Sequence, residues 1–303
     1  MLSIYNIKKW YLMMTGKSLL HVNQDIGKFF SKDDLKGYYN NLTEKVTRQP
    51  QLLNSDELPQ YLTPHKELIH FPVAIFQYGL GAYDMYLKTN EDKYIKKFHQ
   101  CLEWTLAHQE PTGAWNNFSH IYPDNPYGAM AQGEATSLLL RAYMLTKESR
   151  YLEAAKRAID FMLKPVEEGG TTAYQESDII LLEYTHLPAV LNGWIFAWWG
   201  LYDYVLVTKD KNHYSQLLEQ SLQTIETFLP RFDRGYWSQY DLDGHIASPF
   251  YHHLHIAQMQ ALYQLTGHET FRHHATRWQN FELRRLNKYR AFCVKAYQKL
   301  VSP

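Results

Sequence analysis

The chain has 303 residues, of which 45% are hydrophobic and 20% charged, with 31 basic and 31 acidic side chains. This composition is typical of a globular protein with a full core and argues against intrinsic disorder. The zero formal charge gives no global support for nucleic-acid binding, and the apolar run at residues 190–201 is too short to span a bilayer.

The cysteines and the N-terminal residues indicate in which cellular compartment the protein is expected. Cys101 and Cys293 lie far apart in the sequence, which predicts neither a disulfide framework nor a zinc site built on paired cysteines. The N-terminus lacks the charged start, uninterrupted apolar core and small-residue cleavage site of a signal peptide. We therefore expect a cytoplasmic protein without a membrane span.

Residues 1–65 show little sustained periodicity. We treat them as an N-terminal extension to a catalytic domain at residues 66–303. Within the extension, residues 32–46 are compatible with one helix. The extension is expected to pack on the domain or to form one side of its cleft.

One helical unit occurs four times in the rest of the chain. Thr89, Thr146, Thr208 and Thr266 mark equivalent positions, with periods of 57, 62 and 58 residues. An apolar helix with small residues is predicted before each threonine, and a polar turn and an amphipathic helix after it. The predicted apolar helices cover residues 77–87, 129–145, 191–206 and 255–265, and the clearest amphipathic one covers 151–163.

A period near 60 residues with two helices per unit indicates stacked helical hairpins. The apolar helices should lie inside and the amphipathic helices outside. We therefore predict a mainly all-α fold, a closed α/α toroid of four helical hairpins. Loops that join each outer helix to the next inner helix should then converge at one mouth of the ring.

The segment from Gly235 to His255 carries the strongest chemical signal. It holds three tyrosines, one tryptophan and four histidines, with no lysine or arginine. Phenols and imidazoles can transfer protons without a full negative charge, which suits a site for an anionic substrate. Residues 231–303 also carry ten basic against five acidic side chains, which could attract an acidic polymer or form a solvated helix.

Other connecting segments contribute candidate groups. Glu183 and Tyr184 follow an apolar run, and small residues between Tyr127 and Glu134 allow close approach of backbone or substrate. Glu134 and Glu183 could form the acid pair of a glycosidase. His252, His253 and His255 lack the spacing of a metal site, so we predict no metal. Nucleophile-elbow, phosphate-loop and dinucleotide motifs are absent from the sequence.

Several motifs in register resemble the heparosan or heparan sulfate D-glucuronyl C5-epimerases and cover roughly residues 70–280, the helical C-terminal domain of that family. They are Phe71–Leu80, Gly113–Trp115, Tyr127–Gly133, Leu191–Gly193, Gly200–Asp203, Tyr240–Leu242 and Tyr251–His255. The resemblance implies inversion at C5 of glucuronate within a polysaccharide, giving iduronate without chain cleavage and without a cofactor.

The resemblance also implies site residues. The catalytic group would be Glu183, Tyr184, Tyr240 and Tyr251. The substrate-binding candidates are Tyr78, Trp115, Tyr127, Gln132, Asn192, Arg234, Trp237, His252 and His255. The family pattern has an arginine where this chain has Asp243, so Arg234 or a histidine is expected to bind the substrate carboxylate.

The expected partner is a heparosan-like acidic polysaccharide, and a homodimer is left open. We expect Tyr251 and Glu183 to act on opposite faces of the sugar, with Tyr184 and Tyr240 positioning or relaying protons. A polysaccharide lyase would form the same carbanion, and a glycoside hydrolase or a non-catalytic glycan-binding protein are further alternatives.

Overall fold

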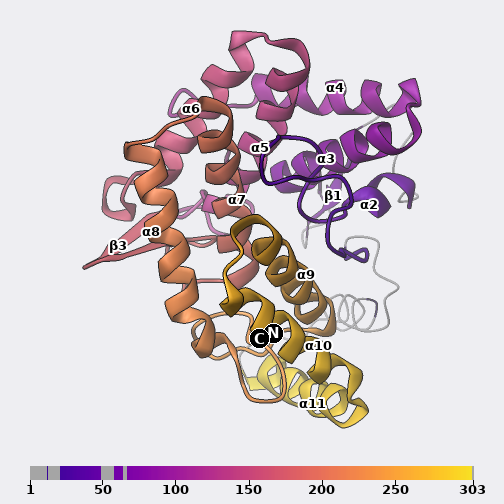
Figure 1. Ribbon diagram of the computed structural model, residues 1–303, viewed down its shortest axis with the longest axis vertical. Coiled ribbons are helices and arrows are strands. Elements are labelled where there is room, and N and C mark those ends of the chain that lie inside the picture. The colour runs from indigo at the N-terminus through magenta and orange to yellow at the C-terminus, as the bar shows by residue number, and fades with distance from the viewer. Residues whose placement is uncertain (1–11, 13–20, 49–57, 64–66, 302–303) are drawn as a thin grey trace.

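The computed structural model describes residue 12 and residues 21–48, 58–63 and 67–301. Helices dominate this part of the chain, and the four helical hairpins predicted from the repeat are confirmed. Figure 1 shows the hairpins following one another in an arc, from α3 and α4 at the upper right to α9 and α10 at the lower right. The inner helices pack in chain order, α3 on α5, α5 on α7 and α7 on α9.

The helices of each hairpin are joined by a short turn. The inner helices are α3 (Pro72–Thr89), α5 (Ala129–Thr146), α7 (Leu191–Thr208) and α9 (Pro249–Thr266). The outer helices are α4 (Asp92–Ala107), α6 (Ser149–Leu163), α8 (His213–Phe228) and α10 (Glu269–Leu283). The short helix α2 (Thr43–Thr47) precedes them, α11 (Arg285–Val301) follows, and the 3₁₀ turns η1 (Val166–Glu168) and η2 (Leu229–Phe232) follow α6 and α8.

The four repeat threonines are the last residues of the four inner helices. Each hydroxyl donates to the carbonyl oxygen four residues earlier, at 2.7 to 3.0 Å. The next residue has a left-handed backbone in every unit, with φ of 56° to 75° at Asn90, Lys147, Lys209 and Gly267. A left-handed residue after the last turn ends a helix. The repeated threonine therefore marks the same kind of helix C-terminus in all four units.

Small residues let the inner helices approach closely. A Cβ atom on Gly200 would lie 2.3 Å from the Cα atom of Gly133, so α5 and α7 touch through their backbones at this crossing. The inner helices are buried on nearly all sides, whereas α6 buries one stripe that includes Ala154, Ala158 and Met162. This difference is the one predicted between inside and outside helices.

The N-terminal segment, residues 21–48, bridges the two ends of the arc, and Figure 1 shows it in indigo between α3 and α9. Asp25 pairs with His253 of α9 at 2.6 Å, and α2 packs on α3. The single helix expected at residues 32–46 was wrong, because only Thr43–Thr47 is helical. Residues before it instead form a loop whose backbone bonds to side chains of the inner helices, as at Tyr38 N and Asp84 Oδ1 (3.0 Å).

Two small antiparallel hairpins complete the fold. One pairs β1 (Tyr61–Leu62) with β2 (Leu68–Ile69), and the other pairs β3 (Thr172–Gln175) with β4 (Asp178–Leu181). The second hairpin packs against α8 and leads the chain back to the inner side of the arc. In the described ranges, no helix has the length and apolar character needed to cross a bilayer.

Candidate active site

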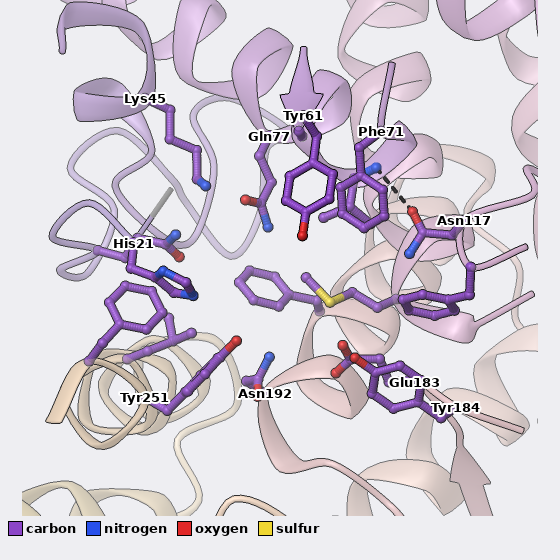
Figure 2. A pocket seen from close by; sticks show the side chains of 18 of the residues that line it. His21, Lys45, Tyr61, Phe71, Gln77, Asn117, Glu183, Tyr184, Asn192 and Tyr251 are labelled. Carbon is purple, nitrogen blue, oxygen red and sulfur yellow. Dashed lines mark hydrogen bonds between the residues drawn. The ribbon is translucent and has the colours of Figure 1, made fainter. Parts of the chain in front are cut away.

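A cavity of about 250 Å³ lies where the N-terminal ends of the inner helices meet the N-terminal segment. Its walls come from α3, α5, α7 and α9, from residues 183–184, and from His21, Gln24 and Lys45. Figure 2 shows Glu183 and Tyr184 on one side, Tyr251 on the other and Asn192 between them. The structure thus brings together Glu183, Tyr184, Asn192 and Tyr251, four of the residues predicted for the site.

Glu183 is placed by the second strand hairpin and by two glycines. It follows β4, and the preceding carbonyl of Leu182 accepts from Ala129 N–H at 2.7 Å. A Cβ atom on Gly193 would lie 2.2 Å from Glu183 Oε2, and one on Gly128 would lie 2.1 Å from Glu183 O. Only glycine at both positions leaves room for this backbone and this carboxyl group.

The Glu183 carboxyl group is poised to take up a proton near neutral pH. Burial raises its pKa to about 7, against a smaller opposing effect of the Tyr184 hydroxyl. Its Oε2 atom is buried and has no hydrogen-bond partner among the residues that the structure describes. A general base works best when its pKa lies near the operating pH.

Tyr184 lies beside Glu183 in an aromatic wall. Its ring centroid is 4.6 Å from that of Phe118 and 5.8 Å from that of Tyr122, which it meets edge to face. Burial raises the pKa of Tyr184 well above the ordinary value, and the Glu183 charge adds to this shift. The phenol is therefore a neutral hydrogen-bond donor at physiological pH.

Tyr251 stands in the first turn of α9. Ser248 caps this helix by accepting from Tyr251 N–H at 3.3 Å, which fixes where the side chain leaves the helix. Burial and then the Glu183 charge raise the pKa of Tyr251, whereas a hydrogen bond with Tyr240 acts in the opposite direction. Tyr251 is accordingly a protonated donor whose ionised form Tyr240 can stabilise.

Tyr240 stands behind Tyr251 and is not among the lining residues of the cavity. The two ring centroids are 4.8 Å apart. The Tyr240 hydroxyl favours ionisation of both Tyr184 and Tyr251 through hydrogen bonds. Its place therefore suits the positioning or relay role expected from the sequence.

Asn192 occupies the floor of the cavity at the start of α7. Its backbone carbonyl accepts from Gln258 Nε2 at 3.1 Å, which anchors this turn to α9. Its side-chain Oδ1 is buried without a hydrogen-bond partner in the described part of the chain. An orphaned buried acceptor next to a cavity is available to a substrate hydroxyl.

The predicted binding residues Tyr78, Trp115, Tyr127 and Gln132 do not line this cavity. Gln132 Oε1 accepts from Trp115 N–H at 3.1 Å, and the Trp115 indole donates to Thr105 O at 2.8 Å. The Tyr127 hydroxyl donates to Glu110 Oε2 at 2.6 Å. These side chains hold the 113–128 loop in place, and Tyr78 is buried in α3 with Lys97 over its ring.

The predicted binding residues of the last repeat also lie outside the cavity lining. The Trp237 ring stacks on His252 at 3.6 Å, and the Ser238 hydroxyl bonds to Nδ1 of both His252 and His255. Burial lowers the pKa of His252 to about 4 and that of His255 well below its ordinary value, so both are neutral core residues. Arg234 is exposed on the loop before them.

Several polar cavity residues were not predicted from the sequence. They are His21, Gln24, Lys45, Tyr61, Gln77, Asn117 and His120. Gln77 carried a usable signal, because a polar side chain near the start of a mostly apolar inner helix indicates a polar surrounding. Lys45 and His21 lie in the non-repeating N-terminal segment, where no periodicity indicates which side chains point inward.

The fold and cavity place the chain among the α/α toroid proteins, with a carboxyl group facing phenols in the central site. Residues 113–280, more than half of the chain, match the family described as D-glucuronyl C5-epimerase C-terminus, and the chain belongs to this family. In the residues described, no group of three or more His, Cys, Asp or Glu side chains is arranged to hold a metal ion.

Relatives extend the comparison. An uncharacterised protein of Methanocaldococcus jannaschii is 36% identical over 157 residues, which are 50% of this chain and 51% of that protein. The D-glucuronyl C5-epimerase of Caenorhabditis elegans is 24% identical over 215 residues, 62% of this chain and 35% of that enzyme. The chain thus spans about half the length of the first relative and about a third of the second.

A solved structure has the same fold. The cellobiose 2-epimerase of Bacillus thermoamylovorans superimposes with a TM-score of 0.50 at 14% identity, covering 69% of this chain and 58% of that chain. At this identity the likeness concerns the helical architecture alone.

Proposed function

We propose that the protein is a carbohydrate epimerase that inverts C5 of D-glucuronate residues in a heparosan-like polysaccharide. The observation that carries this proposal is the placement of Glu183 opposite Tyr251 in one cavity (Figure 2). Inversion at carbon requires a base on one face of the sugar and an acid on the other. The family to which residues 113–280 belong supports the choice of uronate.

The pKa directions suggest which group starts the reaction. Glu183, with a pKa of about 7, is substantially ionised at neutral pH, whereas Tyr251 is protonated. From glucuronate, Glu183 would take the C5 proton and Tyr251 would donate its hydroxyl proton to the opposite face. This step leaves a neutral Glu183 and a Tyr251 phenolate, and proton exchange with solvent restores the starting state.

The remaining residues would lower the barrier by positioning and charge. Removal of a proton α to a carboxylate builds a second negative charge on one small group, so preorganised donors are the largest contribution. In this proposal Tyr184 would donate to that charge, and Tyr240 would stabilise the Tyr251 phenolate through the hydrogen bond that favours its ionisation. The unpartnered Oδ1 of Asn192 would orient a sugar hydroxyl.

Incubation with heparosan in deuterated water tests the proposal. We expect deuterium at C5, iduronate in the product and unchanged chain length. Glu183→Gln and Tyr251→Phe should each reduce the exchange rate by roughly 100-fold to 10,000-fold, the usual contribution of a general acid or base. Tyr127→Phe is the matched control, because its hydroxyl bonds to Glu110 and the residue does not line the cavity.

Other outcomes identify the competing functions. Shorter chains with UV-absorbing unsaturated ends would indicate a lyase. New reducing ends without deuterium at C5 would indicate a hydrolase. Binding of the polymer without exchange or cleavage would indicate a glycan-binding protein.

A further inference from the structure

Lys45 is the only lysine or arginine among the described residues that line the cavity. It belongs to α2, outside the segment that matches the family. Figure 2 shows its side chain extending from the N-terminal segment toward the cavity that Glu183, Asn192 and Tyr251 border. Among the described lining residues, its ammonium group is therefore the candidate to form an ion pair with a substrate carboxylate.

The backbone that carries Lys45 is firmly held. Leu42 and Val46 are buried against α3, and a Cβ atom on Gly81 would lie 2.4 Å from Leu42 O. Helix α2 therefore rests directly on the backbone of α3. A short helix seated this closely sets the position from which the lysine side chain reaches the cavity.

A buried carboxyl group of α5 interacts electrostatically with the lysine. Glu134 is fully buried, and its Oε1 accepts from Gln77 Nε2 at 2.7 Å. Burial raises the pKa of Glu134 to about 8 and lowers that of Lys45 to about 8, while each charge favours the other. Burial thus favours the neutral form of the Glu134 carboxyl group beside the lysine.

From this arrangement we propose that Lys45 binds the uronate carboxylate of the substrate and selects acidic sugars over neutral ones. The inference rests on the proposed function, because it names the group that recognises the carboxylate in the same site. A bound carboxylate forms an ion pair with the ammonium group. The same ammonium group offsets the second negative charge that develops on the carboxylate when the C5 proton is removed. A neutral sugar cannot form this ion pair, so it lacks the contribution that the ammonium group makes to binding a carboxylate.

Binding measured without turnover tests this selection. In the Glu183→Gln background, affinities for heparosan and for carboxyl-reduced heparosan are compared by calorimetry. We expect a preference for the acidic polymer that falls by roughly 10-fold or more in Lys45→Met, the usual effect of losing a hydrogen bond to a charged group. Lys93→Met, which removes an exposed lysine paired with Glu91, should leave the preference unchanged.

A second measurement keeps the test decisive if Lys45→Met does not fold. In Glu183→Gln, the preference should disappear as the pH rises through about 8, the pKa of Lys45, because the ammonium form exists only below it. Lys45→Arg should keep the preference above this pH. The other titratable groups facing the cavity or the lysine are Glu134, His21, His120, Tyr61, Tyr184 and Tyr251.

The two proposals fail in different ways. Absence of deuterium exchange at C5 in the wild-type protein would contradict the proposed function. A different result would overturn only the role of Lys45. In that case the wild type exchanges at C5, and folded Lys45→Met keeps its full preference for the acidic polymer. If Lys45→Met does not fold, a preference that persists above pH 9 in Glu183→Gln has the same consequence.

Discussion

Gly193 shows how a single missing methyl group shapes the site. Its Cα lies so close to Glu183 that an added Cβ would stand 2.2 Å from Oε2 and 2.7 Å from the glutamate Cβ. Both distances are below 3.0 Å, which Cβ atoms in proteins essentially never show. The glutamate therefore has to move if a side chain is introduced at position 193. The carboxyl position therefore depends on a residue that has no chemistry of its own.

We expect Gly193→Ala to lower the C5 exchange rate by about 100-fold, since displacements of about 1 Å can cost this much. The measurement is deuterium incorporation at saturating polymer, alongside a thermal unfolding curve. Gly79→Ala is the control, because it crowds Leu138 of α5 and Cys101 of α4 and leaves Glu183 untouched. Equal losses of exchange in the two variants would contradict a specific role for Gly193.

The raised pKa of Glu183 predicts a pH dependence. Its base form exists only above its pKa of about 7, so kcat/KM for glucuronate should fall about tenfold per pH unit as the pH drops below 7. Initial rates of deuterium incorporation between pH 5 and 7 measure this limb. A flat profile in that interval would assign the proton abstraction to another group.

Residues differ in how far their roles could be predicted from the sequence. Glu183, Tyr184 and Tyr251 were predicted because they stand in connecting segments that a hairpin ring brings together, and they do border one cavity. His252 and His255 stand in an equally suggestive run. However, the Ser238 hydroxyl bonds to Nδ1 of both rings, and His252 Nε2 bonds to Trp278 O at 3.1 Å. No sequence pattern predicts these contacts.

At the scale of elements, the repeat predicted the hairpins well because the same local physics ends each inner helix. A threonine recurs at every terminus and is visible in the sequence, and its hydroxyl bonds back to the last turn. Helix starts were less accurate: α3 and α9 begin at Pro72 and Pro249, five and six residues before the expected Gln77 and His255. Proline suits the first helical position, so Pro72 and Pro249 themselves indicate these helix starts.

Helix α11 supports the segment that connects Tyr240 to Tyr251. Gln298 Oε1 accepts from Ile246 N–H at 2.9 Å, and its Nε2 donates to Gly244 O at 2.9 Å. Lys295 Nζ donates to Ile246 O at 2.7 Å. A helix beyond the family match thus fixes the backbone that presents Tyr240.

Gln298→Ala should lower kcat for C5 exchange by roughly fivefold while KM changes little, because about 1 kcal/mol of positioning is lost and no cavity wall is removed. Steady-state kinetics on the polymer distinguish the two parameters. Gln279→Ala, at an exposed position of α10, serves as the matched control. A rise in KM with unchanged kcat would instead place Gln298 in substrate binding.

At the scale of the whole molecule, a buried ionic cluster joins the N-terminal segment to the arc. Arg141 of α5 pairs with Asp203 of α7 at 2.7 Å, and both side chains are almost completely buried. Arg141 also donates to Gly37 O at 3.0 Å, and the Tyr39 hydroxyl donates to Asp203. One guanidinium group therefore ties together two inner helices and the segment that carries Lys45.

Such a cluster could not be predicted from the sequence, because its partners are separated by 62 and 104 positions. Arg141 lies in an apolar helix with no local signal for its partners. The same long-range contacts explain why residues 21–48 form part of the cavity wall instead of a loosely attached extension. Three of the seven polar residues missed in the site, His21, Gln24 and Lys45, belong to this segment.

We expect Arg141→Met to destabilise the protein by about 3 to 5 kcal/mol, because it leaves the buried Asp203 without its cation. Urea unfolding at pH 7 measures the change. Arg150→Met, which breaks exposed pairs with Glu103 and Glu148, should cost at most about 1 kcal/mol. Near-equal costs would show that the buried cluster contributes no more than a surface pair. A large cost for Arg141→Met, with proteolysis starting within residues 21–48, would establish that this cluster holds the cavity wall in place.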